Sequence, residues 1–145
     1  MLEANSIGWG CSGRNAGFVL PGSGRLGYRQ LVNRFGKQAA LTLHDNYLEA
    51  INLLELLNEK TAVDINRTEQ GYLKLAHSKN WLKKLQTGAD YLASNFDYQV
   101  EFLDKHTLQT NYVNHQKAEG AIRYDNGFGI NPLKLINSYA KYAQS

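Results

Sequence analysis

The chain has 145 residues, of which 43% are hydrophobic and 20% charged, which suits one ordinary folded domain and excludes a disordered chain. The formal charge of +3 comes from cations interleaved with acids, and no basic cluster favours nucleic-acid binding. No apolar run approaches the ~20 residues of a membrane span. Cys11 is the only cysteine and Met1 to Asn5 lack a secretory pattern, so we expect a reducing, cytoplasmic compartment.

The first part of the chain is rich in glycine. Residues 1–4 are typical of the end of a strand, and five of the thirteen glycines then fall between Gly8 and Gly22. Such a density predicts tight turns or a backbone that another group approaches closely. A short apolar run at residues 18–20 ends at Pro21.

Two helices are expected after this region. The pattern becomes helical from about Tyr28, and a longer helix is predicted over roughly residues 37–60. Spacings of three and four place its apolar side chains in one stripe that must pack against something. The stripe consists of Ala40, Leu43, Tyr47, Ile51, Leu54 and Leu57.

The rest of the chain alternates strands with helices. Strands are predicted at residues 70–76, 100–103 and 120–124. Ser78 is expected to cap a helix that runs to about Asn95, and Asp104 to cap a short helix. The side chains expected to face inward are Trp81, Leu85, Ala89 and Leu92 on the longer helix, Leu108 on the shorter one, and Leu133, Ile136 and Ala140 on a last helix opened by Asn131-Pro132. The fold class is therefore α/β, with α and β elements mixed.

The residue types that suit a cofactor lie near the start. In a dinucleotide-binding βαβ unit an acid at the end of the second strand binds the ribose hydroxyls, and Glu3 fits that position. Ser12 can cap a helix and leave N–H groups facing an anion, while Gly13 lets backbone approach a flat ligand. Arg14 adds a fixed cation, and Asn15 offers both a donor and an acceptor.

Residues 2–17 resemble the segment after the second strand in the D-amino-acid-oxidase-like (DAO) family of FAD-dependent oxidoreductases. The closest branch is that of γ-glutamylputrescine oxidoreductase, which shows Leu-Glu-Ala followed by a glycine, a small residue and Ser-Gly-Arg-Asn. Residues 120–124 and 127–135 resemble the family's strand, glycine turn and proline-initiated helix. The strands at 71–76 and 100–104 fall in the order of its substrate domain, so the resemblance covers nearly the whole chain.

The resemblance implies a cofactor, a reaction and a division into domains. Glu3 would bind the FAD ribose, and Ser12, Gly13, Arg14 and Asn15 would line the pyrophosphate and the flavin. The substrate would be a small-molecule amine or amino acid, whose C–N bond is oxidised by hydride transfer to FAD. The family places the FAD-binding domain at residues 1–36, part of the substrate domain at 37–130, and a helix returning to the FAD-binding domain at 131–145.

Departures from the family pattern limit these expectations. The Gly-x-Gly-x-x-Gly turn and the later part of the pattern are absent from the chain, so we expect a partial enzyme that is inactive when isolated and binds FAD weakly or not at all. Cys11 replaces the branch's usual alanine, with a small buried thiol as the expected role. Asn131 stands where members often have histidine. The alternative is a non-catalytic module derived from such an enzyme, which binds a partner through the stripe from Ala40 to Leu57.

Other chemistry has little support in the sequence. The four histidines show no metal spacing with Cys11 or with acids, and no serine has the context of a hydrolase nucleophile. His44 and Asp45 are expected on the polar face of a helix. The tyrosines, including Tyr72, Tyr91, Tyr98 and Tyr124, are expected in the core and at its rim, with a substrate pocket as the less favoured alternative.

Overall fold

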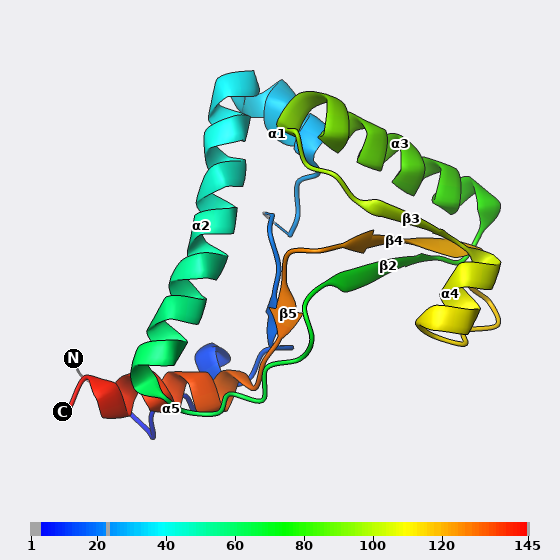
Figure 1. The fold of residues 1–145 in the computed structure, drawn as a ribbon. Coiled ribbons are helices and arrows are strands. Elements are labelled where there is room, and N and C mark those ends of the chain that lie inside the picture. The colour runs from blue at the N-terminus through cyan, green and yellow to red at the C-terminus, as the bar shows by residue number, and fades with distance from the viewer. Residues whose placement is uncertain (1–3, 23, 145) are drawn as a thin grey trace. The chain divides into compact units, whose positions relative to one another are not determined.

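The computed structural model describes residues 4–22 and 24–144, which cluster into two compact units (Figure 1). Unit 1 consists of Met1–Pro21, Asp45–Gln70 and Gly127–Ser145, and unit 2 of Gly22–His44 and Gly71–Asn126. Each unit therefore gathers segments that are far apart in the sequence. The mixed α/β class expected from the sequence is confirmed.

The helices and strands agree closely with the hydrophobic patterns. The helices are α1 (Tyr28–Phe35), α2 (Lys37–Thr61), α3 (Lys79–Phe96), α4 (Lys105–Asn111) and α5 (Pro132–Tyr142), with a 3-10 turn, η1, at Cys11–Gly13. The strands are β1 (Phe18–Val19), β2 (Tyr72–Ala76), β3 (Glu101–Asp104), β4 (Gly120–Tyr124) and β5 (Phe128–Gly129). On α2 the expected stripe is confirmed, since Ala40 and Ile51 are buried and its other members are half-buried.

Two of the expected helix caps are present. Ser78 Oγ accepts a hydrogen bond of 3.2 Å from the backbone N–H of Trp81, at the start of α3. Asp104 Oδ1 accepts one of 2.7 Å from Thr107 N–H, at the start of α4. These side chains satisfy backbone donors that have no partner inside the helix, so they fix where each helix begins.

Unit 2 is built on an antiparallel sheet with the strand order β2-β4-β3 (Figure 1). The register places Leu75, Ala121 and Leu103 opposite one another on one face of the sheet. Leu108 of α4 packs with this row, and both Leu103 and Leu108 are essentially inaccessible to solvent. The other face of the sheet packs against α3. Alternation along the strands thus supplies one apolar face for each helix.

A cluster of aromatic side chains forms a second buried region of unit 2. Rings of Tyr28, His44, Phe96 and Tyr98 meet edge to face, with centroids 4.8–5.5 Å apart in the closest pairs. A hydrogen bond of 2.8 Å joins the Tyr28 hydroxyl to His44 Nδ1. The expectation that His44 lies on a polar face was wrong, because this bond and the surrounding rings let the imidazole be buried.

One residue on α3 also differs from expectation. Trp81 is 48% exposed, although the spacing predicts it on the inward face with Leu92, which is 4% exposed. Trp81 lies in the first turn of α3, where Ser78 binds its N–H and Lys84 Nζ lies 6.0 Å from its ring centroid. The first turn therefore extends past the part of the helix that packs.

Unit 1 is held together by backbone hydrogen bonds between distant segments. Strands β1 and β5 pair as an antiparallel ribbon, and Ile130 N–H donates to the Gly17 carbonyl over 2.8 Å. A third segment runs beside β5, since Asn131 N–H donates to the Ile65 carbonyl over 2.7 Å and Thr68 N–H to the Gly129 carbonyl over 2.9 Å. The ribbon therefore connects the glycine loop to the start of α5.

Candidate cofactor site

The glycine loop of unit 1, residues 6–17, is shaped by its own side chain–backbone bonds. Asn15 Nδ2 donates to the carbonyls of Cys11 and Ser12 over 3.2 and 3.1 Å, and Asn15 Oδ1 accepts from Gly17 N–H over 2.9 Å. Both ends of the Asn15 amide are thus used to fold the loop. Asn15 positions its neighbours, a role that the sequence-based expectation of a ligand contact did not include.

Glycine is required at two loop positions by close contacts within the chain. A Cβ on Gly13 would lie 2.2 Å from the Gly8 carbonyl oxygen, and one on Gly17 would lie 2.1 Å from the Ile130 carbonyl oxygen. Gly17 also has a φ of +71°, which L side chains rarely adopt. The close approach that the sequence indicated is therefore made by the chain's own backbone, so these glycines give no separate evidence for a flat ligand.

Ser12 does not cap a helix, and that expectation was wrong. Ser12 lies in the middle of η1, whose N-cap position is Gly10 and whose start carries no side-chain cap hydrogen bond. The cause is the tight turn in which Arg14 N–H donates to the Cys11 carbonyl over 3.2 Å. Ser12 is nevertheless exposed on the loop.

The loop presents an exposed cation beside backbone donors. The Arg14 guanidinium lies over the Trp9 ring, 4.4 Å from its centroid, and forms no salt bridge within residues 4–22 and 24–144. In the same part of the chain the N–H groups of Asn15 and Ala16 donate no hydrogen bond. A guanidinium and successive N–H groups are the donors that bind an anionic group such as a phosphate.

An open groove of about 610 Å³ is lined by Asn15 and Ala16, which carry these N–H groups, but not by Arg14. Asn15, Ala16 and Phe18 line one part of it, and Thr68 and Asn131 line another. Thr68 was not expected at a site, because it is some fifty positions away from the loop in sequence. It is held at the groove by a hydrogen bond of 2.8 Å that Gly129 N–H donates to Thr68 Oγ1. No signal in the local sequence could have identified it.

Asn131 has a structural role at the edge of this groove. Its Oδ1 accepts a hydrogen bond of 3.1 Å from Lys134 N–H and so caps α5, with Pro132 at the first position of the helix. The start of the last helix predicted from Asn131-Pro132 is thus confirmed. Asparagine suits this position as it stands, since it is among the best N-cap residues.

Glu3 and Cys11 are the remaining candidate residues from the sequence. Glu3 lies outside the described residues, and its contact with the ribose stays a prediction. Cys11 is exposed rather than buried, because the tight turn directs it to the surface, so the expectation of a buried thiol was wrong. Within residues 4–22 and 24–144 no group of histidine, cysteine and acidic side chains could hold a metal ion, and no helix is long and apolar enough to span a membrane.

Of the four tyrosines expected in the core or at its rim, Tyr98 and Tyr124 are buried and Tyr72 and Tyr91 are half-buried. The Tyr72 and Tyr124 rings stack with centroids 4.6 Å apart. Burial raises the pKa of both phenols, and it raises the pKa of Tyr98 to about 12. All three hydroxyls therefore stay protonated near neutral pH, so none acts as a base there.

The fold and the loop define a class: a mixed α/β protein whose glycine loop offers backbone donors at an open groove and carries an exposed cation, Arg14, between two of the lining residues. The sequence matches the profile of the DAO family, FAD dependent oxidoreductase, over residues 1–145. The chain belongs to the DAO family of FAD-dependent oxidoreductases. FAD is accordingly the cofactor that the family implies.

Solved structures of two kinds of amino-acid enzyme share the fold. Glycine oxidase from Geobacillus kaustophilus matches with a TM-score of 0.73 and 24% identity, over 99% of this chain and 36% of its own. Glycine oxidase from Bacillus cereus ATCC 14579 matches with a TM-score of 0.61 and 19% identity, over 92% of this chain and 33% of its own.

The L-amino acid deaminase from Proteus myxofaciens, in complex with anthranilate, matches with a TM-score of 0.62 and 17% identity, over 92% of this chain and 28% of its own. The chain thus spans about a third of each of these structures. A search of curated proteins finds no match.

Proposed function

We propose that this chain forms part of an FAD-dependent oxidoreductase that oxidises the C–N bond of an amine or amino acid. The observation that carries the proposal is the family match over residues 1–145. The glycine oxidases and the L-amino acid deaminase of similar fold support the substrate class, because they act on amino acids by their names.

The exposed loop of unit 1 supplies the residues proposed to hold the cofactor. Arg14 would pair with the pyrophosphate, and the N–H groups of Asn15 and Ala16 would donate to it. Ser12 offers an exposed hydroxyl, and Gly13 keeps the turn tight enough to bring Arg14 beside these donors. Glu3 completes the proposed set as the partner of the adenosine ribose.

The proposed reaction divides the work between cofactor and chain. Bound FAD would accept a hydride from the carbon next to the substrate nitrogen, leaving an imine that water hydrolyses. The chain's contribution is to hold the cofactor: Asn15 keeps the loop folded, and Arg14 offsets the negative charge of the pyrophosphate.

We propose that the chain contributes to two domains of the enzyme. Residues 1–36 and 131–145 would belong to the FAD-binding domain and residues 37–130 to the substrate domain. Because the chain spans about a third of the structures that it matches, we propose that the 145 residues alone bind FAD weakly and carry out no turnover.

A finer proposal concerns the substrate. The pattern from Leu2 to Asn15 favours the γ-glutamylputrescine branch, so we propose that the whole natural protein oxidises γ-glutamylputrescine or a similar acylated amine. In the FAD-loaded natural protein, anaerobic addition of γ-glutamylputrescine should bleach the flavin absorbance faster than glycine does. Faster bleaching by glycine would refute the branch and leave the family reaction intact.

Cofactor binding is tested with one variant and a matched control. In the whole natural protein, Arg14→Gln should weaken FAD binding about tenfold, as expected for loss of one charge-assisted hydrogen bond. Arg34→Gln is the control, because that exposed arginine also lies over a neighbouring ring, 5.4 Å from the Phe35 centroid, but is far from the loop in sequence. Quenching of flavin fluorescence measures both affinities. Equal effects of the two changes would refute the role of Arg14.

A further inference from the structure

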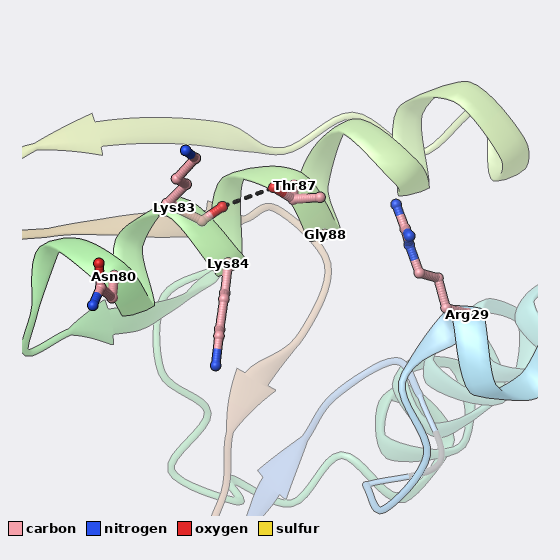
Figure 2. A pocket seen from close by; sticks show the side chains of 6 residues that line it. All are labelled: Arg29, Asn80, Lys83, Lys84, Thr87 and Gly88. Atoms are coloured by element: carbon pink, nitrogen blue, oxygen red, sulfur yellow. Dashed lines mark hydrogen bonds between the residues drawn. The ribbon is translucent and has the colours of Figure 1, made fainter.

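Two adjoining hollows open on unit 2 beside α1 and α3. One has a volume of about 620 Å³ and the other of about 250 Å³, and both are lined by Arg29, Lys84 and Gly88. Figure 2 shows Arg29 extending from α1 toward α3, and Lys84 and Gly88 on α3. Together the hollows have the size of a small-molecule site.

The lining of these hollows is positively charged. Arg29, Lys83 and Lys84 line the larger hollow, and Lys74 joins Arg29 and Lys84 in the smaller one. No aspartate or glutamate lines either hollow, and none of these four cations forms a salt bridge within residues 4–22 and 24–144. Cations that gather around a concave surface without acidic partners attract an anion.

The smaller hollow also has an apolar, aromatic wall. Tyr91, Leu92 and Tyr124 line it, the last two of them buried. Arg29 lies 4.8 Å from the Tyr91 ring centroid and Lys74 Nζ lies 5.0 Å from that of Tyr124. Burial lowers the pKa of Lys74, in keeping with an ammonium group partly withdrawn from water. The cations are therefore held against the rings that form the wall.

Gly88 bears on the room that the hollows offer a ligand. It lies inside α3, where glycine is less favourable than alanine by ~1 kcal/mol. A Cβ at Gly88 would meet no atom within 4 Å, so packing within the chain gives no reason for glycine there. Gly88 is exposed and lines both hollows, so glycine leaves their shared edge free of a side chain.

We propose that these hollows bind a small organic anion, whose carboxylate or phosphate is held by Arg29, Lys74 and Lys84 and whose apolar body rests against Tyr91 and Tyr124. The charges select the anionic group, the aromatic wall selects an apolar body, and the missing side chain at Gly88 leaves room for it. This site is separate from the loop at Arg14 and does not rest on the proposed oxidoreductase function.

Calorimetric titration of the full chain tests the site with defined probes. Phenylacetate and phenyl phosphate carry both parts of the proposed ligand, whereas inorganic phosphate and benzyl alcohol each carry one. We expect at least one aromatic anion to bind saturably and more tightly than either partial probe. Binding of phenylacetate alone would assign a carboxylate ligand, and binding of phenyl phosphate alone a phosphate ligand. If neither binds, or if benzyl alcohol binds equally well, the proposal is wrong.

Variants locate the bound anion. Lys84→Gln should weaken binding about fivefold, the upper range for an exposed ion pair. Lys79→Gln, on the same helix but in neither lining, should leave the affinity unchanged. Gly88→Leu should abolish binding while the helical circular dichroism is kept. If Gly88→Leu fails to fold, the two lysine variants decide. Full affinity in folded Gly88→Leu, or equal losses in the two lysine variants, would overturn the site.

Discussion

The two units of the chain are stabilised in different ways. Unit 2 has an apolar core in which Leu103, Leu108 and Ala121 are essentially inaccessible, and it buries an aromatic cluster as well. Unit 1 buries fewer large side chains, such as Ile65 and Phe128, and relies on backbone bonds among its glycine loop, its short ribbon and the segment at residues 65–68.

The two ways of stabilising a unit differ in how far they restrict the sequence. Side-chain burial tolerates neighbouring changes in the sequence as long as volume is kept. The close backbone approaches at Gly13 and Gly17 leave no room for a side chain at these two positions, and they fix the backbone that carries Arg14. A unit built in the second way suits a site that must hold a ligand in one position.

The largest effect is expected from emptying the core of unit 2. Leu108→Ala should lower the free energy of unfolding by roughly 3–4 kcal/mol, because the buried leucine leaves a cavity. Urea unfolding followed by circular dichroism measures the change. Leu56→Ala is the matched control, a helical leucine that is 56% exposed, and should cost less than about 1 kcal/mol. Similar losses of stability in both variants would show that burial of Leu108 does not stabilise unit 2.

A smaller loss is expected from the loop of unit 1. Gly17→Ala should cost roughly 2–3 kcal/mol, because the new Cβ would meet the Ile130 carbonyl oxygen and the positive φ would be strained. Gly10→Ala is the control, since a Cβ there meets nothing within 4 Å. The same urea titration applies. A Gly17→Ala protein as stable as Gly10→Ala would show that the backbone contact does not stabilise unit 1.

The smallest effect concerns a helix cap and its pH dependence. The N–H of Thr107, followed by its side-chain hydroxyl, lowers the pKa of the Asp104 carboxyl. A pKa lower in the folded state contributes stability that is present above the unfolded value near 4 and is lost as the pH falls through the folded value. Asp104→Asn keeps a capping oxygen but does not titrate. The midpoint temperature of thermal unfolding should therefore fall less between pH 6 and pH 2 in this variant than in the unaltered chain. An unchanged pH profile would contradict the assignment.

Much of the secondary structure follows from local pattern. The strand at residues 72–76 alternates, the helix at 37–61 repeats apolar residues at three and four, and Ser78 and Asp104 occupy sites that favour capping side chains. Each of these signals lies within a few residues of the helix or strand that it predicts, so the sequence alone was enough to predict these elements.

The site was less predictable because its contacts join distant residues. β1 and β5 have two residues each and carry no periodicity, yet their pairing aligns Gly17 with Ile130. The loop was correctly singled out as glycine-rich. The contact that requires Gly13 is with Gly8 in the same loop, but the contact that requires Gly17 is with Ile130, more than a hundred residues away. His44 was misplaced for the same reason, since its hydrogen-bond partner Tyr28 is on another helix.

The sheet of unit 2 ends on β2 and β3, neither of which has a further strand partner within the described residues. On β3, Phe102 is 44% exposed. An open strand edge with an exposed aromatic side chain is a template on which another extended chain can add. When the 145 residues are prepared alone, this edge is therefore the place where concentration-dependent self-association should begin, and low protein concentration is the condition that keeps the chain monomeric.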